Sequence, residues 1–165
     1  MSSEPTVPLK QRVDEIFNGL KDRNPNWTQE QITPAKKVIE LFESAFIYRD
    51  FDNVKRIVTN TYVQHNPFLH DDPYSIIEFG KWKRSIAKET QNFDGPPALI
   101  YHRIMVDGDL VYVQLEWRNH PGDLGINIMD LLRWNKDLQQ FTEHWDANQE
   151  VPPKDKRNNQ NGIFD

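Results

Sequence analysis

The sequence predicts an α+β domain in which helices come first and an antiparallel sheet follows. Two observations carry this prediction. Apolar residues repeat with a helical period of 3.6 as far as Ile86, and after Gly95-Pro96-Pro97 they repeat with a period of two. Turn-forming residues such as Asp107-Gly108 then separate the apolar runs. A chain of 165 residues is the size of one domain with one hydrophobic core.

Composition divides the chain into three parts. Residues 1–33 are polar apart from a helical stripe, and this stripe predicts a short amphipathic helix in an N-terminal extension that could serve as a lid or a dimer contact. The stripe consists of Val13, Ile16, Phe17 and Leu20, with Trp27 as an apolar anchor behind it. Residues 34–150 form the domain itself. Residues 151–165 are proline- and asparagine-rich, and we expect a flexible tail.

Three helices are predicted in the first half of the domain. The first opens at Thr33-Pro34, with threonine as the N-cap and proline at the first helical position. A short second helix covers residues 51–58, and a third starts around Asp72-Pro73. Between the second and third helices, residues 62–67 form a brief extended segment that ends at Pro67.

Four strands are predicted in the second half. Residues 99–106 and 110–118 form a hairpin, because Asp-Gly between alternating apolar runs is a strong hairpin signal. Residues 126–134 and 139–145 form two more strands, which the turn-prone stretch Asn135-Lys136-Asp137 separates.

Charge and composition exclude several classes of function. The net charge is −5, and the densest basic stretches, at residues 81–84 and 154–157, are short, so we expect no nucleic-acid partner. The absence of cysteine excludes disulfides, thiolate metal sites and a cysteine nucleophile. No stretch approaches the ~20 apolar residues of a membrane span, and the N-terminus does not resemble a secretory signal. We therefore expect a cytoplasmic protein that does not bind membranes.

Polar residues within apolar strands are the candidate site residues. Asp130 lies in the middle of a predicted strand, where burial of its carboxyl group would raise the pKa toward that of a useful base. A plain ion pair with Arg118 or Arg133 is the alternative. On the last strand, His144 and Asp146 share one face and Glu143 and Trp145 share the other, by the two-residue period of a strand.

Three further observations leave alternatives open. His144 either faces inward, as a proton donor or shuttle, or faces solvent. His65 is either a site residue or, with Asn66, satisfies backbone groups at a strand end. The face that carries Gln114 and Glu116 is expected to be exposed. No pair of histidines has a chelating spacing, so we expect no metal site.

Three motifs, in their order along the chain and in their spacing, resemble the SnoaL-like branch of the nuclear transport factor two-like superfamily. They are residues 62–67 (Tyr-Val-Gln-His-Asn-Pro), residues 106–111 (Val-Asp-Gly-Asp-Leu-Val), and residues 130–133 (Asp-Leu-Leu-Arg) followed by residues 143–146 (Glu-His-Trp-Asp) and Gln149. The resemblance covers residues 34–150. It implies a cone-shaped fold in which about three helices pack on a strongly curved antiparallel sheet and enclose a pocket, and it implies a homodimer.

The resemblance also implies a chemistry. Asp130 takes the place of the acid/base carboxylate, with His65 and His144 at the motif histidines. Gln114 stands where many relatives have a histidine, and a neutral amide there can bind a carbonyl but cannot shuttle a proton. The expected substrate-binding residues are Gln114, Tyr62, Trp82, Trp145 and Asp146. The expected function is cofactor-independent aldol cyclisation, enolisation or isomerisation of a small hydrophobic carbonyl compound. The alternative is a non-catalytic module that binds a small molecule or a protein.

Overall fold

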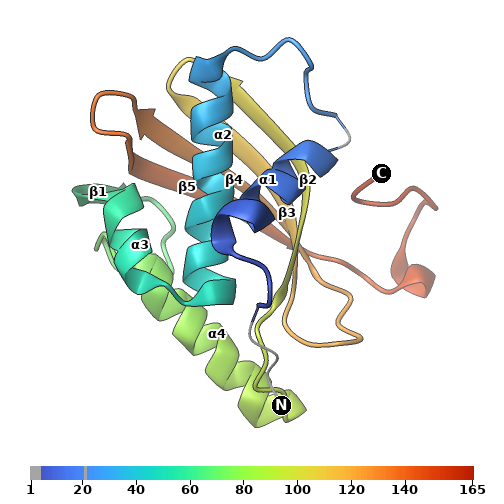
Figure 1. Cartoon of the computed structure of the whole chain (residues 1–165). Coiled ribbons are helices and arrows are strands. Elements are labelled where there is room, and N and C mark those ends of the chain that lie inside the picture. Colours follow the sequence, from blue (N-terminus) through green and yellow to red (C-terminus); the bar gives the residue numbers. More distant parts are fainter. Residues whose placement is uncertain (1–4, 21) are drawn as a thin grey trace.

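The computed structural model describes residues 5–20 and 22–165 (Figure 1). Its helices and strands follow one another in the predicted order, with helices concentrated in the first half. They are α1 (Leu9–Gly19), α2 (Gln29–Phe42), the π-helical segment η1 (Glu43–Tyr48), α3 (Phe51–Ile57), β1 (Val58–Gln64), α4 (Ser75–Gln91), β2 (Ala98–Asp107), β3 (Leu110–Arg118), β4 (Ile126–Asn135), β5 (Gln140–Glu150) and the 3₁₀ segment η2 (Lys154–Lys156). The predicted α+β class is confirmed.

The five strands form one sheet in the order β1-β5-β4-β3-β2. Strands β2 to β5 pair antiparallel in sequence order. Strand β1 pairs parallel to β5, so the sheet is mixed, and the expectation of a purely antiparallel sheet is wrong at this edge. The reason is the connection: the chain leaves β1 at one edge and reaches β2 at the other through α4, and such a crossover does not impose the reversal that a hairpin does.

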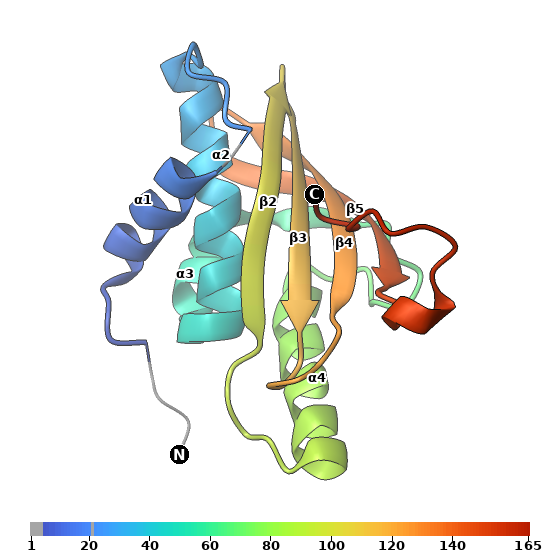
Figure 2. The same cartoon turned by 90° about the vertical axis from the view of Figure 1, so that its right-hand side faces the viewer.

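The helices and the C-terminal tail lie on opposite faces of the sheet. Figure 2 shows α1, α2 and α3 on one side of strands β2 to β4, and the tail on the other. We call the helix-covered side the inner face and the tail side the outer face. The core lies between α2 and the inner face, and its fully buried side chains include Val38, Ile39, Leu41, Val111, Val113, Leu132 and Phe141.

The first long helix begins five residues earlier than the sequence predicted. It starts at Gln29 rather than at Thr33-Pro34, and Pro34 lies inside it. The side-chain oxygen of Gln31 accepts a hydrogen bond from the Thr28 backbone N–H at 3.0 Å, which satisfies a donor that a helix start otherwise leaves free. The stabilisation that this contact gives to the earlier helix start is larger than the cost of the single backbone hydrogen bond that Pro34 cannot make.

The N-terminal helix packs on α2 as its apolar stripe predicts. The rings of Phe17 and Trp27 lie 6.0 Å apart, and Lys36 pairs with Asp14 at 2.7 Å across the two helices. At the other end of the chain, the Phe164 ring stacks on His102 of β2 at 4.4 Å. The tail therefore covers part of the outer face.

The predicted hairpin is confirmed, with its turn one residue later. Asp107 pairs with Leu110, which leaves Gly108 and Asp109 as the loop. Gly108 has a φ of +58°, the conformation that primed hairpin turns require and that glycine adopts without steric cost.

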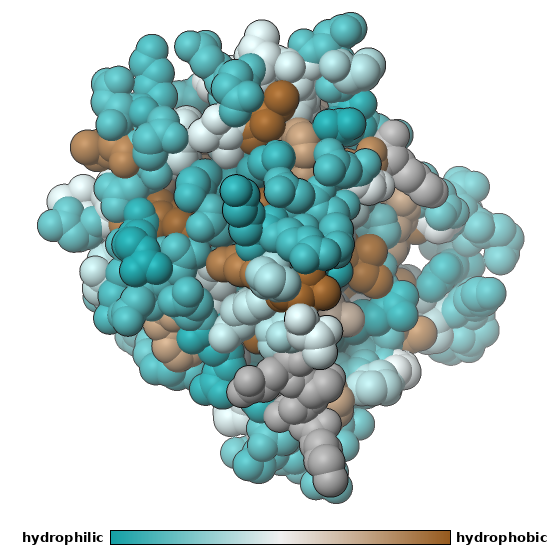
Figure 3. Space-filling model, in the orientation of Figure 1, coloured by the Kyte–Doolittle hydropathy of each residue, from teal (hydrophilic) through white to brown (hydrophobic). Residues whose placement is uncertain are grey.

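The molecular surface seen in Figure 3 is mostly hydrophilic, with small hydrophobic patches between the polar groups. Among the helices of the described residues, none has the length and apolar character needed to cross a bilayer.

Candidate acid–base site

A cavity of about 50 Å³ lies between the inner face of the sheet and the helical layer. Its wall is largely aromatic and aliphatic, and its polar groups come from β1, β4, β5 and the segment after β1. The lining residues are Phe42, Phe46, Tyr62, Gln64, Asn66, Leu69, Ile76, Phe79, Leu115, Trp117, Ile128, Asp130, His144, Asp146 and Asn148. A mainly apolar wall on which polar groups converge is typical of ligand sites.

Strand register places the carboxyl group of Asp130 in this cavity. Asp130 lies opposite Val113 of β3 and opposite Asp146 of β5, and facing residues of paired strands share a side of the sheet. Its polar partner is His144, with Nε2 3.0 Å from Asp130 Oδ1. The alternative of an ion pair with an arginine is wrong, because Arg118 pairs with Glu116 and Arg133 with Glu143 and Asp109.

Burial raises the pKa of Asp130 above its ordinary value. The hydrogen bond and the charge of His144 oppose this increase, and the carboxylate of Asp146 adds to it. Only 6% of Asp130 is exposed, so removal from water decides the direction. The carboxyl group therefore holds a proton more tightly than an exposed aspartate does.

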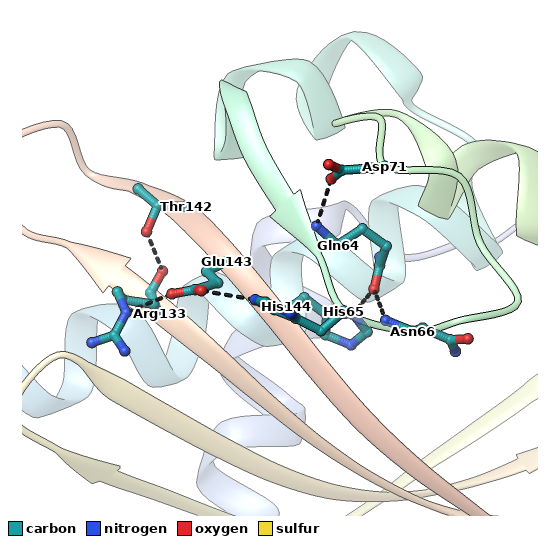
Figure 4. A network of polar contacts seen from close by, with 8 residues as sticks. All are labelled: Gln64, His65, Asn66, Asp71, Arg133, Thr142, Glu143 and His144. Atoms are coloured by element: carbon teal, nitrogen blue, oxygen red, sulfur yellow. Dashed lines mark hydrogen bonds and ion pairs between the residues drawn. The ribbon is translucent and has the colours of Figure 1, made fainter.

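The neighbouring Gln64 fixes the tautomer of His144. The backbone N–H of Asn66 donates to Gln64 Oε1 at 2.9 Å, so this atom is an acceptor. Nδ1 of His144 lies 2.9 Å from the same oxygen and must donate to it. Figure 4 shows Gln64 contacting both His144 and Asn66.

One proton must therefore lie between His144 Nε2 and Asp130. With Nδ1 protonated, a neutral imidazole presents only a lone pair at Nε2. An unprotonated carboxylate would meet that lone pair with an acceptor, and the 3.0 Å contact would be repulsive. Either the Asp130 carboxyl group carries the proton and donates it, or His144 is an imidazolium that donates to the carboxylate. The pair is arranged to pass one proton between its members.

Tyr62 and Asp146 complete the polar part of the wall. Asp146 Oδ2 accepts hydrogen bonds from the side-chain amides of Asn66 and Asn148, both at 2.8 Å. Burial, with the nearby charges of Asp130 and Asp146, raises the pKa of Tyr62 well above its ordinary value. Its hydroxyl group therefore keeps its proton at neutral pH and is available as a hydrogen-bond donor.

Two of the expected site residues, His65 and Trp145, lie on the outer face instead. Their rings stack 4.7 Å apart, and His65 Nε2 contacts Glu143 Oε1 at 2.8 Å in the network that Figure 4 shows. Hydrogen bonds from Arg133 and His65 lower the pKa of Glu143. The two-residue period of β1 and β5 puts these side chains on the opposite face from His144, outside the cavity lining.

Gln114 is also on the outer face, but it is not exposed. Only 4% of Gln114 and 3% of Glu116 are accessible, so the expectation of a solvent-facing polar surface is wrong. Gln114 accepts a hydrogen bond from Arg103 at 2.9 Å and donates to Asn127 at 2.9 Å, close to the tail at Ile163. The C-terminal tail covers this face. The alternation of residues along a strand could not reveal that packing.

Trp82 is 55% exposed and lies outside the cavity. It lines a neighbouring surface groove with Phe68 and Tyr74. Leu69 and Phe79 line both the groove and the cavity, so the groove leads to the wall of the acid–base site.

The sequence interpretation missed the positioning roles of Gln64 and Asn66. A signal was present, because alternation along residues 62–66 puts Tyr62, Gln64 and Asn66 on one side and His65 on the other. This face could be assigned to the cavity only once β1 was known to pair with β5 beside His144.

Among the described residues, one group of side chains could hold a metal ion. It consists of Asp130, His144 and Asp146, whose ligand atoms lie within 4.8 Å of one another. The sequence did not reveal this set because its members lie on two strands. A cation here would replace the proton that Asp130 and His144 share, and would compete with the amides that hold Asp146.

Comparison with protein-family models gives no match, and comparison with curated proteins gives none either. Solved structures do match. A protein from Jannaschia sp. CCS1 named as a SnoaL-like polyketide cyclase is 13% identical, with a TM-score of 0.55 over 76% of this chain and 91% of that one.

Two further structures agree with the first. A protein of the same name from Shewanella putrefaciens CN-32 is 15% identical, with a TM-score of 0.53 over 90% of this chain and 92% of that one. One from Bacillus cereus named as a polyketide cyclase is 14% identical, with a TM-score of 0.53 over 76% and 80%. The chain therefore has the fold of the SnoaL-like, nuclear transport factor two-like proteins that its sequence motifs resemble.

Proposed function

We propose that this protein catalyses acid–base chemistry on a small hydrophobic carbonyl compound, with Asp130 and His144 as the catalytic pair and with no cofactor. The observation that supports the proposal most directly is the single proton that must lie between His144 Nε2 and Asp130 in an apolar cavity. A group that can both release and accept a proton is what enolisation requires. The names of the structural neighbours agree with this class of reaction.

The geometry suggests how the roles divide. When the shared proton is on His144, Asp130 is a carboxylate and removes a proton from the carbon next to the substrate carbonyl. Negative charge then develops on the carbonyl oxygen and needs a donor. His65, one of the two donors that the sequence suggested, is on the other face of the sheet. Both ring nitrogens of His144 are already engaged, Nδ1 by Gln64 and Nε2 by Asp130. Tyr62 lines the cavity and keeps its proton, so we assign the donor role to Tyr62.

The wall selects the class of substrate. Phe42, Phe46, Phe79 and Trp117 supply apolar surface, which favours a hydrophobic ligand and excludes water from the enolate. The cavity of about 50 Å³ is small compared with the roughly 300–1,000 Å³ of typical ligand pockets. A polyketide-sized ligand would therefore need the adjoining groove beside Leu69 and Phe79. The reaction would be an aldol cyclisation or an isomerisation, as in a lyase or isomerase of secondary metabolism.

Solvent-proton exchange at the carbon next to the carbonyl tests this proposal. Deuterium incorporation into a panel of hydrophobic ketones is followed by NMR with the wild type and with Asp130→Asn. Asparagine can donate its amide N–H to His144 Nε2 and so keeps the contact while removing the base. We expect exchange to fall by about 10²–10⁴-fold, the usual contribution of general-base catalysis.

Asp137→Asn is the matched control, because it removes a carboxylate from the exposed turn between β4 and β5 and should leave the rate unchanged. Full exchange activity in Asp130→Asn would refute the assignment. Binding of ketones without exchange in the wild type would favour the alternative, a non-catalytic binding module of the same fold.

A further inference from the structure

A second cavity lies beside α4, on the far side of an aromatic wall from the acid–base site. Its volume is about 30 Å³, room for about two water molecules. Phe46 and Trp117 line both cavities. Their rings meet edge to face at 4.7 Å and form the partition between them.

The charge of this second cavity is opposite to that of the protein. Four of its lining residues are cationic, namely Arg49, Lys81, Lys83 and Arg84. None of the described residues that line it is acidic, although the whole chain carries a net charge of −5. Concentration of like charges around a hollow opposes folding unless an anion reduces the repulsion.

Two of the four cations are already neutralised. Lys81 pairs with Glu78 at 2.8 Å, and Arg84 pairs with Asp94 at 3.0 Å. Arg49 and Lys83, in contrast, have no carboxylate within ion-pairing distance among the residues that the structure describes.

Lys83 is also partly withdrawn from water. Burial lowers its pKa, and the more distant charges of Asp123 and Glu150 oppose this decrease. Its ammonium group lies 5.8 Å from the centre of the Phe79 ring. A desolvated cation without a carboxylate partner gains most from an anion that enters the cavity.

We propose that the cavity beside α4 binds a small oxyanion, a carboxylate or a phosphate group, through Arg49 and Lys83. Its floor is the Phe46–Trp117 partition, so the bound anion lies directly behind the apolar wall of the acid–base site. In the sequence, residues 81–84 stood out only as a short basic stretch. The tertiary structure instead brings this stretch against Arg49, which lies more than thirty residues earlier in the chain.

Titration of the ¹⁵N-labelled protein at low ionic strength tests the proposal without any turnover. Inorganic phosphate and acetate are the probes, and they distinguish a tetrahedral from a planar anion. We expect saturable shifts at Gly80, Arg84 and Asn119, which line the cavity. Arg49→Asn suits the positive φ of 57° at this position, because asparagine tolerates it. This variant and Lys83→Met should each weaken binding about tenfold or more, as expected for the loss of a charge-assisted contact.

Two controls make the result decisive. Lys136→Met removes the same charge from the remote β4–β5 turn and should bind both probes as the wild type does, and Lys83→Arg should restore most of the affinity. Absence of saturable shifts with both anions would overturn the proposal. Equal weakening by Lys136→Met would also overturn it, because the effect would then reflect net charge alone. Because binding is measured directly, failure here leaves the acid–base proposal unaffected, and the converse also holds.

Discussion

The proton shared by Asp130 and His144 predicts a pH dependence of stability that one substitution removes. In the folded protein, Gln64 holds the Nδ1 proton of His144, and a further proton lies between Nε2 and Asp130. In the unfolded chain above pH 7.5, aspartate is ionised and histidine is neutral, with reference pKa values of about 3.9 and 6.5. Folding therefore takes up close to one proton for as long as the folded pair retains it.

The size and sign of the effect follow from linkage. When the folded state binds more protons, the free energy of unfolding falls as pH rises, by about 1.4 kcal/mol per pH unit for one proton. This agrees with the raised pKa of Asp130, whose stabilising contribution is complete at low pH and is lost as pH rises through the folded-state value. The loss is to be followed from pH 5 to 9, and it ends at the pH where the folded pair releases its proton.

Urea unfolding of the wild type and of Asp130→Asn across this pH range measures the effect. The other titrating groups are common to both proteins and cancel in the difference. We expect Asp130→Asn to become progressively more stable than the wild type as pH rises. A difference that stays constant over the whole range from pH 5 to 9, or that changes in the opposite direction, would show that no proton is shared and would refute the tautomer argument.

Two further predictions concern the scaffold. Phe141 is fully buried and packs edge to face on Trp134 at 5.0 Å. Phe141→Ala should therefore lower the free energy of unfolding by about 3–5 kcal/mol. A loss below 1 kcal/mol in urea unfolding would mean that this part of the core is wrongly described. Glu43 is fully buried, with Arg12 at 3.5 Å, and burial raises the pKa of its carboxyl group. The stabilising contribution of this carboxyl group is present at low pH and is lost as pH rises through its folded-state pKa. Glu43→Gln should therefore match the wild type in thermal stability near pH 4 and exceed it near pH 7. A lower thermal stability of Glu43→Gln at pH 7 would show that the pair with Arg12 dominates.

Local pattern was enough to predict the helices and most of the strands. The stripe of Val13, Ile16 and Phe17 predicted α1, and the change to a period of two predicted the strands from β2 onward. These signals are carried by neighbouring residues, because the 3.6 and 2.0 periods follow from backbone geometry alone. The start of α2 was misplaced because two candidate cap residues lay only five positions apart, and the local pattern did not rank Thr28 above Thr33.

The candidate site was predictable only in part. Asp130 stood out because a carboxylate interrupts an apolar run, and His144 and Asp146 because they share one face of a single strand. Motif position alone could not tell that His65 and Trp145 lie on the outer face, or that Gln114 lies beneath the tail. Which face of a strand is buried depends on what packs against it, and the tail is distant in sequence.

The sequence by itself determined the class of the fold and singled out the carboxylate that lines the cavity. Each of these depends on residue type and on spacing within one segment. Only the tertiary structure decided that Gln64 orients His144, that His144 rather than an arginine is the partner of Asp130, and that Arg49 joins Lys83 around a second cavity. The reason is physical: these contacts join different strands and helices, and their distances follow from strand register and helix packing, which no single segment encodes.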